Sequence, residues 1–254
     1  MGADQELTGD AGQEPGVRRR RARRWLVVAA RALAAVLALA VGGLLLWNGP
    51  GVMSAEPGPW EGVQHDPAIR VEQRDSAVVL HPAHPVGTQR GLVFYPGAEV
   101  EPEACAARLS GLVAEEGMTV VIPDPWLHLA LFDRRDVTAF TAEAPQVNDG
   151  FVGGHSMGGV RACRLAPESE GLLLGSYCAT DLSGTALSVL SIGGSQDGLS
   201  TPEKIAAARD ILPADAAMEE IPEASRASFG NQGPQTARGS ACSRISGGSR
   251  SPRP

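Results

Sequence analysis

The sequence predicts an α/β fold, a mostly parallel central sheet with helices on both faces, preceded by one N-terminal transmembrane helix. Three observations predict this arrangement. Short apolar runs alternate with helical patterns between residues 76 and 235. A nearly uninterrupted apolar stretch of 23 residues lies at 25–47, and a Gly-x-Ser-x-Gly pentapeptide stands at 154–158. A chain of 254 residues has room for one such domain beside the membrane segment.

The N-terminal region predicts a charged tail followed by a membrane anchor. Residues 1–24 carry four acidic side chains and then an arginine cluster, with no hydrophobic periodicity before that cluster, so we expect a disordered basic tail. Residues 25–47 are long enough to cross a hydrocarbon core about 30 Å thick. Only Arg31 interrupts them, and Trp25 and Trp47 bracket them as interfacial aromatic residues often do.

The arginine cluster also predicts the orientation of this anchor. Basic residues beside a span stay in the cytoplasm, which places everything after Asn48 outside it, in a single-pass protein of the cell membrane. A cleaved signal peptide is one alternative, although its apolar core is only about 7–15 residues long and Met53-Ser54-Ala55 is a weak cleavage site. A buried soluble helix is another, which the flanking arginines and the all-round apolarity disfavour.

Charge excludes one class of partner. The whole chain has a formal charge of −7, but residues 55–235 hold 25 acidic and 11 basic side chains, a balance of −14. Such a domain repels phosphates, so we expect no nucleic acid partner.

The cysteines indicate no metal site, because their spacing matches no metal-ligand pattern. A disulfide is possible in an exported domain, but its connectivity does not follow from the sequence. Cys163 and Cys178 fit equally well as small buried apolar residues. The four cysteines are Cys105, Cys163, Cys178 and Cys242.

Proline and glycine pairs at 49–51 and 57–59 predict an irregular linker over residues 48–75. Strands that lack clean alternation and are separated by helices predict a parallel sheet covered on both faces, over residues 76–235. Residues 236–254 are rich in Ser, Gly and Arg and contain no acid, so we expect a disordered C-terminal tail. The expected strands are 78–80, 91–95, 118–122, 150–153, 171–177, 187–192 and 217–221, and the expected helices are 102–116, 160–166 and 202–212.

The pentapeptide Gly154-His155-Ser156-Met157-Gly158 fits a nucleophile elbow, in which a serine sits on a sharp turn between a strand and a helix. The strained turn leaves no room for side chains two residues away on either side, which explains both glycines. The sequence therefore predicts Ser156 as a nucleophile. His155 occupies the variable position of the motif, points away from the serine and is interpreted as structural.

Two further elements of a serine hydrolase site are expected beside this serine. Asp197 follows the expected strand 187–192 on a loop, where the acid of a Ser…Asp…His triad belongs. An oxyanion hole needs two backbone N–H groups, for which we expect Met157 and Ala98.

Residues 76–235 resemble a compact bacterial branch of the α/β-hydrolase superfamily, the α/β-hydrolase fold-5 type. The resemblance implies a serine hydrolase that acts on carboxylic esters, without metal or cofactor, and often preceded by a single membrane span. Four segments carry it: Gly91-Leu92-Val93-Phe94-Tyr95-Pro96-Gly97-Ala98, Gly154-His155-Ser156-Met157-Gly158-Gly159, Gly194-Ser195-Gln196-Asp197-Gly198 and Phe229-Gly230-Asn231-Gln232-Gly233-Pro234-Gln235.

The chain departs from the family at its catalytic base. The family enters the fourth segment through Gly-Gly-Asn-His-Ala, whereas this chain has Glu223-Ala224-Ser225-Arg226-Ala227, so Arg226 stands at the position of the histidine. Arginine stays protonated and offers no acceptor, so it cannot take the serine's proton. The five histidines all precede Asp197, and His128 alone follows a strand in a position to replace the base. They are His65, His81, His84, His128 and His155.

Two hypotheses about function follow. The first is an ester hydrolase whose catalysis is impaired or absent, acting on a small ester-like molecule. The second is a non-catalytic binding or scaffold protein that uses the same pocket, with Arg226 as a fixed cation for a carboxylate or phosphate. A degenerate copy that folds poorly is a third possibility.

Overall fold

The computed structural model describes residues 15–85, 89–142 and 144–233. The chain divides into two compact units, residues 1–50 and residues 51–254.

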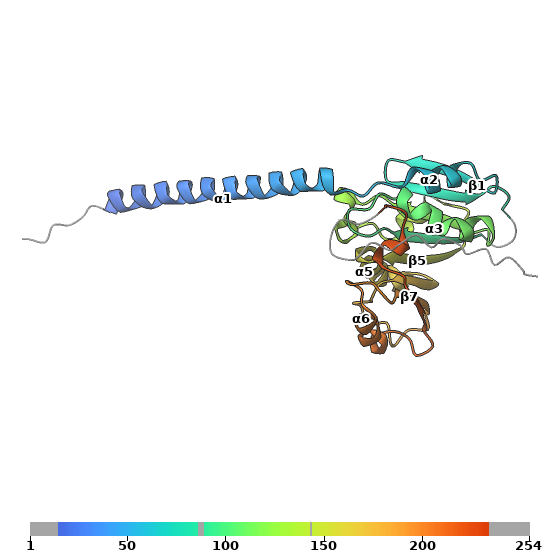
Figure 1. Cartoon of the computed structure of the whole chain (residues 1–254). Coiled ribbons are helices and arrows are strands. Elements are labelled where there is room, and N and C mark those ends of the chain that lie inside the picture. Colours follow the sequence, from blue (N-terminus) through green and yellow to red (C-terminus); the bar gives the residue numbers. More distant parts are fainter. Residues whose placement is uncertain (1–14, 86–88, 143, 234–254) are drawn as a thin grey trace, which may run out of the picture. The chain divides into compact units, whose positions relative to one another are not determined.

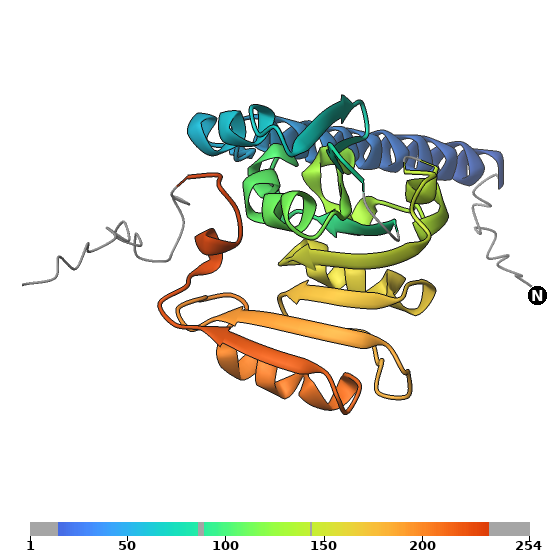
Figure 2. The same ribbon diagram turned by 90° about the vertical axis from the view of Figure 1, so that its right-hand side faces the viewer.

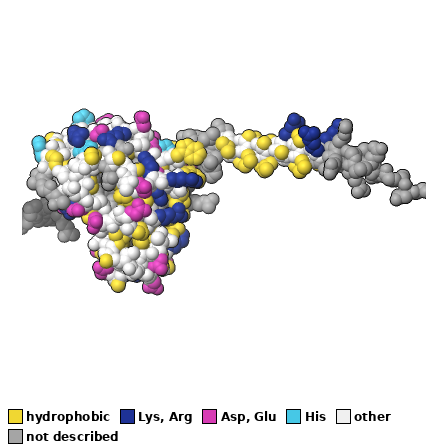
Figure 3. All heavy atoms as spheres, turned by 180° about the vertical axis from the view of Figure 1, so that it is seen from behind, with side chains coloured by type: hydrophobic (Ala, Val, Ile, Leu, Met, Phe, Trp, Pro, Cys, Tyr) yellow, Lys and Arg dark blue, Asp and Glu magenta, His cyan; other side chains and the backbone are white. Residues whose placement is uncertain are grey.

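The first unit is a single helix, α1 (Pro15–Gly51). Its segment Arg23–Gly43 has a mean hydropathy of 2.2, and its length and composition suit a membrane span as well as a signal sequence. Figure 3 shows hydrophobic side chains around the described part of this helix, with Lys and Arg side chains toward its N-terminal end.

The predicted tail and linker are wrong where they meet α1. Residues 15–24 and 48–51 lie in the helix rather than in irregular structure. Proline is favoured in the first turn of a helix, and alanine and arginine are strong helix formers, so α1 extends beyond its apolar segment. Residues 1–14 lie outside the described part of the chain.

The second unit is built on an eight-stranded sheet with the order β1-β2-β4-β3-β5-β6-β7-β8 (Figure 1). Strand β2 pairs antiparallel with both β1 and β4, and every later pair is parallel. This confirms the mostly parallel sheet. The strands are β1 (Ile69–Arg74), β2 (Ala77–Pro82), β3 (Arg90–Tyr95), β4 (Thr119–Pro123), β5 (Asp149–His155), β6 (Gly171–Gly175), β7 (Ser188–Gly194) and β8 (Ala217–Ile221).

Helices connect the strands and lie on both faces of the sheet (Figures 1 and 2). The α-helices are α2 (Pro57–Gln64), α3 (Glu103–Ala114), α4 (Val137–Thr141), α5 (Met157–Leu165) and α6 (Pro202–Ala207). Short 3₁₀ turns complete them: η1 (Trp126–His128), η2 (Ala130–Phe132), η3 (Ala166–Glu168), η4 (Arg209–Ile211) and η5 (Arg226–Phe229). The helix expected over 202–212 is thus α6 followed by η4, and the helix expected from 160 starts at Met157.

The central strands are apolar on both sides, which is why their sequences do not alternate. In β3, Leu92 and Phe94 join the core under α2 and α3, whereas Val93 and Tyr95 join the core under α5. Both cores bury aliphatic side chains almost completely, as Leu80 and Val79 on the two sides of β2 illustrate.

The linker predicted over 48–75 is wrong for most of its length. Residues 57–64 form α2 and residues 69–74 form β1, which pairs with β2 through the turn at Asp75-Ser76. Pro57 stands in the first turn of α2, where proline fits a helix. Strand β1 was missed because charged residues alternate with Ile69 and Val71, as on a sheet edge.

The edge formed by β7 and β8 is covered on one side. Ile205 of α6 lies next to Gly193 on the covered side. On the other side Leu190 and Ile221 are 38% and 47% exposed, and no helix of the described residues packs over them (Figure 2). Residues 236–254, the expected C-terminal tail, lie outside the described part of the chain.

Two of the cysteines are joined. Cys163 of α5 and Cys178, which follows β6, form a disulfide with a Cα–Cα distance of 5.8 Å, and both are buried. Cys105 of α3 is free and buried. Cys242 lies outside the described residues. The bond ties the helix after the elbow to the strand beside it.

Removing this disulfide should lower the stability of the domain. A loop closed over 15 residues contributes about 3 kcal/mol by restricting the unfolded chain. For a domain of this size we expect Cys163→Ser/Cys178→Ser to lower the unfolding temperature by about 6–12 °C, measured by near-ultraviolet circular dichroism in detergent. Dithiothreitol should lower the unfolding temperature of the wild-type protein by a similar amount and should not change that of the double variant. Equal unfolding temperatures for both proteins without reductant would contradict the prediction.

Candidate active site

The predicted elbow forms as a sharp turn between β5 and α5. Ser156 follows β5 directly and adopts φ 57° and ψ −121°, which a residue with a side chain rarely adopts. A Cβ at Gly158 would overlap the carbonyl oxygen of Tyr95, and one at Gly154 would overlap the backbone of Gly158. The two glycines therefore permit a close backbone approach that holds Ser156 in its strained conformation.

Parallel strands bring the candidate residues to one edge of the sheet. Ser156 follows the carboxyl end of β5, and Asp197 follows the carboxyl end of β7. Asp197 is only 3% exposed. Its Oδ1 accepts hydrogen bonds from the amides of Leu199, at 2.8 Å, and Ser200, at 2.9 Å, while its Oδ2 is buried and has no hydrogen-bond partner among the described residues. One oxygen fixes the carboxylate, and the other remains an open acceptor.

The loop after β3 lies against the serine, as an oxyanion loop would. A Cβ built on Gly97 would stand 3.7 Å from the Cβ of Ser156. The next residue is Ala98, and Met157 is the first residue of α5. Within the described residues neither of their amides donates a hydrogen bond to the protein. These two groups are free to receive a developing negative charge, and their assignment as an oxyanion hole stays a prediction.

Arg226 reaches Ser156. Its segment is fastened to the loop that carries Asp197, because the amide of Gln196 donates to the carbonyl of Ala224 at 2.9 Å. A capping box between Ser225 and Ser228 then starts η5. From there Nη2 of Arg226 donates a hydrogen bond to Oγ of Ser156.

Arg226 and Asp197 interact without direct contact. Within the described residues no nitrogen of Arg226 lies within 4.0 Å of the carboxylate, so the two groups interact only through their charges. Burial lowers the pKa of Arg226 below its ordinary value, and the negative charge of Asp197 acts in the opposite direction. The guanidinium has its direct contact with the serine instead.

His155 is held as a neutral, buried ring. It stacks on Phe229 with ring centroids 4.8 Å apart, a partner that the sequence showed only as part of the fourth family segment. Burial lowers the pKa of His155 to about 3, and the charge of Arg226 adds to this effect while Asp197 opposes it. Its Nε2 is buried without a hydrogen-bond partner in the described part of the chain. The ring packs against Phe229 and is neutral at neutral pH, and its structural role stays a prediction.

His128, the histidine that the sequence left as a candidate base, contacts another residue. Its Nδ1 lies 2.9 Å from Oδ1 of Asp124, in a contact within the loop after β4. Both residues line a pocket of about 500 Å³ that does not include Ser156. Among the described residues no histidine hydrogen-bonds to Ser156, and no group of three or more His, Cys, Asp or Glu side chains is placed to hold a metal ion.

The lowered pKa of His155 predicts a pH dependence of stability. In the unfolded chain an imidazole binds a proton near pH 6.5, whereas in the folded protein it does so only near pH 3. Between these pH values the unfolded state binds more protons than the folded state. His155 therefore makes the free energy of unfolding fall as the pH falls below 6.5. His155→Phe keeps an aromatic ring on Phe229 but removes the titrating group. Between pH 6 and pH 5 we expect its free energy of unfolding, measured by urea unfolding, to fall by about 1 kcal/mol less than that of wild type. The exposed His65 provides the control, since His65→Gln should follow wild type; parallel curves for wild type and His155→Phe would refute the prediction.

Comparison with known proteins identifies a family. The model of the alpha/beta hydrolase family matches residues 91–250, more than half of the chain. No curated protein matches the sequence significantly.

Solved structures give weaker similarities. TT1662 from Thermus thermophilus is 17% identical, with a TM-score of 0.46, over 62% of this chain and 90% of that one. Est1E from Butyrivibrio proteoclasticus is 14% identical, with a TM-score of 0.45, over 63% and 91%. XC6422 from Xanthomonas campestris, described as a serine hydrolase without lid, is 17% identical, with a TM-score of 0.48, over 63% and 86%. The family match, on a sheet that carries Gly-x-Ser-x-Gly at a strand-to-helix turn, confirms the predicted fold class: the chain belongs to the alpha/beta hydrolase family.

Proposed function

We propose that this protein is a membrane-anchored member of its family with a carboxylic ester hydrolase site whose catalysis is impaired or absent. The observation that carries the proposal is the contact between Arg226 and Ser156, in which a guanidinium donates to the oxygen that a base would have to deprotonate. In this proposal Ser156 is the nucleophile, Asp197 the triad acid, and Met157 and Ala98 the oxyanion donors. The substrate class is a small ester.

The chemistry of arginine supports this proposal. A nucleophilic serine must transfer its proton to an acceptor as it attacks, and the guanidinium has only donors. Although burial lowers the pKa of Arg226, an arginine pKa starts above 12 and the group stays charged. Donation to Oγ also occupies a lone pair of the attacking atom. Without a base, an oxyanion hole and substrate binding alone give a residual acceleration of about 10³–10⁴-fold over water.

A second candidate function is the capture of an anion without turnover. The guanidinium of Arg226, the hydroxyl of Ser156 and the amide of Met157 are three donors around one point of the sheet edge. A planar carboxylate or a phosphate matches such a set. In this candidate Arg226 is the binding group and the protein is a binding or scaffold protein.

We also propose the membrane topology, with the N-terminus in the cytoplasm and the domain outside it. The support is the arginine cluster before the apolar part of α1, together with the disulfide between Cys163 and Cys178, since disulfides persist in oxidising compartments. The acidic balance of the domain disfavours a nucleic acid partner.

Restoring an imidazole should restore catalysis. Arg226→His places a base beside Ser156 and offers the open Oδ2 of Asp197 a donor to orient the ring. We expect hydrolysis of p-nitrophenyl acetate to rise by about 10²-fold or more, and a fluorophosphonate probe to label Ser156 in this variant and not in wild type.

Two matched variants separate the candidates. Arg226→Gln removes the charge without providing a base, so it should stay inactive, and Ser156→Ala in the Arg226→His background should abolish the gain. Fast labelling of the wild-type serine would contradict impaired catalysis. If Arg226→His gains nothing while wild type binds butyrate or phosphate and Arg226→Gln does not, as measured by calorimetry, the anion-binding candidate replaces the hydrolase.

The topology makes its own prediction. Because α1 would cross the bilayer once, the chain should remain in the membrane after extraction with alkaline carbonate and keep its full mass. Protease added outside intact cells should remove the domain, whereas protease added to inside-out vesicles should reach only the N-terminal residues. Release of a shortened soluble domain would show instead that α1 is a cleaved signal sequence.

A further inference from the structure

Large apolar side chains are exposed on one loop at the carboxyl edge of the sheet. We call residues 126–132, between β4 and α4, the aromatic loop. Trp126 is 68% exposed, Phe132 is 53% exposed and Leu131 is 40% exposed. The rings of Trp126 and Phe132 lie 6.2 Å apart, so these two side chains form a small apolar surface, and Leu131 precedes Phe132 in the same loop. A cluster of this kind is costly in water and is typical of a contact surface.

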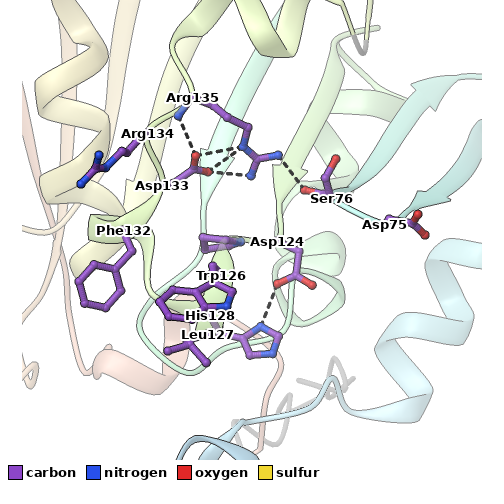
Figure 4. A pocket seen from close by; sticks show the side chains of 11 residues that line it. Asp75, Ser76, Asp124, Trp126, Leu127, His128, Phe132, Asp133, Arg134 and Arg135 are labelled. Atoms are coloured by element: carbon purple, nitrogen blue, oxygen red, sulfur yellow. Dashed lines mark hydrogen bonds and ion pairs between the residues drawn. The ribbon is translucent and has the colours of Figure 1, made fainter. Parts of the chain in front are cut away.

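The aromatic loop is held in this conformation by its neighbours (Figure 4). Nδ1 of His128 lies 2.9 Å from the carboxylate of Asp124. At the end of the loop Arg135 donates to Asp133 at 2.7 Å and to the carbonyl of Ser76 at 3.3 Å. Burial acts to raise the pKa of Asp133, but the hydrogen bonds and charge of Arg135 hold it below its ordinary value, so the pair stays ionised.

Backbone strain also indicates that the aromatic loop is held in one conformation. Leu127 and His128 have φ angles of 58° and 51°, so two successive residues with side chains adopt the left-handed conformation. Such a conformation costs energy and persists only where surrounding contacts determine it. The exposed position of Trp126 is therefore a fixed property of the fold.

Hydrogen bonds connect this loop to the first residues of the domain. Met53 forms a parallel bridge with Val100, and its amide donates to the carbonyl of Glu99 at 2.6 Å. The amide of Glu99 in turn donates to the carbonyl of His128 at 3.0 Å. Two successive backbone contacts thus link residue 53 to the aromatic loop.

Chain length limits how far the loop can lie from a membrane that holds the apolar segment. That segment ends at Trp47, six residues before Met53. Six residues span at most about 20 Å when fully extended. The polar interface of a bilayer adds roughly 5–8 Å beyond each side of the hydrocarbon core. In an anchored chain this tether therefore limits the distance between Met53 and the edge of the hydrocarbon core to about 20 Å.

We propose that the aromatic loop docks into the lipid interface of the membrane, with Trp126, Leu131 and Phe132 among the headgroups. This proposal rests on the proposed membrane anchor. Tryptophan favours that layer because its amphipathic ring meets both water and hydrocarbon, and apolar Leu and Phe side chains bury at the boundary with the acyl chains. The domain's charge balance of −14 opposes attraction to an anionic surface, so the contact is apolar and needs no anionic lipid. Docking holds the sheet edge that carries Ser156 close to the bilayer.

Tryptophan fluorescence of the full chain in phosphatidylcholine vesicles tests the proposal. The chain has four tryptophans, Trp25, Trp47, Trp60 and Trp126. Three variants of the full chain each keep a single tryptophan, Trp47, Trp60 or Trp126, and have phenylalanine at the other three positions. Phosphatidylcholine brominated on its acyl chains quenches rings that lie at the interface. We expect emission from the chain with Trp126 alone to fall at least twofold in brominated vesicles, with no further change when phosphatidylglycerol is added.

The other two versions make the outcome specific. Trp60 is partly buried against the core, so its emission should not change. Quenching of Trp47 reports insertion of the anchor by itself. If Trp47 is quenched and Trp126 is not, the docking proposal is wrong and the anchor remains supported. If Trp47 is not quenched, both the anchor and the docking proposal are wrong. Should the Trp60→Phe change disturb folding, a chain that keeps both Trp60 and Trp126 gives the same comparison against one that keeps Trp60 alone.

Discussion

The close backbone approach at the elbow positions everything else in the site. Ser156 keeps its strained backbone because the turn between β5 and α5 packs directly against the end of β3. A Cβ atom at Gly154 or Gly158 would overlap backbone atoms there, so only glycine fits these two positions. This contact fixes the direction of Oγ, the start of α5 and the loop after β3 together. A strained serine is preserved only where surrounding packing determines it, so the elbow is intact as architecture whatever its chemical activity.

Arg226 brings a positive charge to the elbow. In the proposed function this charge stands where a neutral group would have to accept a proton, and its contacts extend through the site. It contacts Ser156, it adds to the burial that keeps His155 neutral, and it leaves Oδ2 of Asp197 without a donor from the described residues. The unpaired oxygen is unusual, because buried carboxylate oxygens are rarely left without partners. The amides of Leu199 and Ser200 still hold that carboxylate in place.

The sequence predicts an element correctly where its local pattern agrees with its packing in the folded domain. The central strands were predictable because both of their faces are buried, and the elbow because sterics dictate its glycines. Strand β1 was missed because its charged residues resemble a linker, and α2 because proline and glycine begin it. The partner of Arg226 could not be predicted, since a long flexible side chain reaches either Asp197 or Ser156 and only packing decides between them. The pairing of Cys163 with Cys178 likewise depends on α5 lying beside β6, which is a tertiary fact.

The segment after α1 also braces the candidate oxyanion loop. The carbonyl of Met53 accepts from the amide of Glu101 at 3.1 Å, and its amide donates to the carbonyl of Glu99, so Met53 clamps both sides of Val100, two residues beyond Ala98. Glu99 has a φ of 58°, which shows how tightly this turn is shaped. The same turn contacts His128 on its other side. The first residues of the domain, the candidate oxyanion loop and the aromatic loop therefore form one hydrogen-bonded series at the sheet edge.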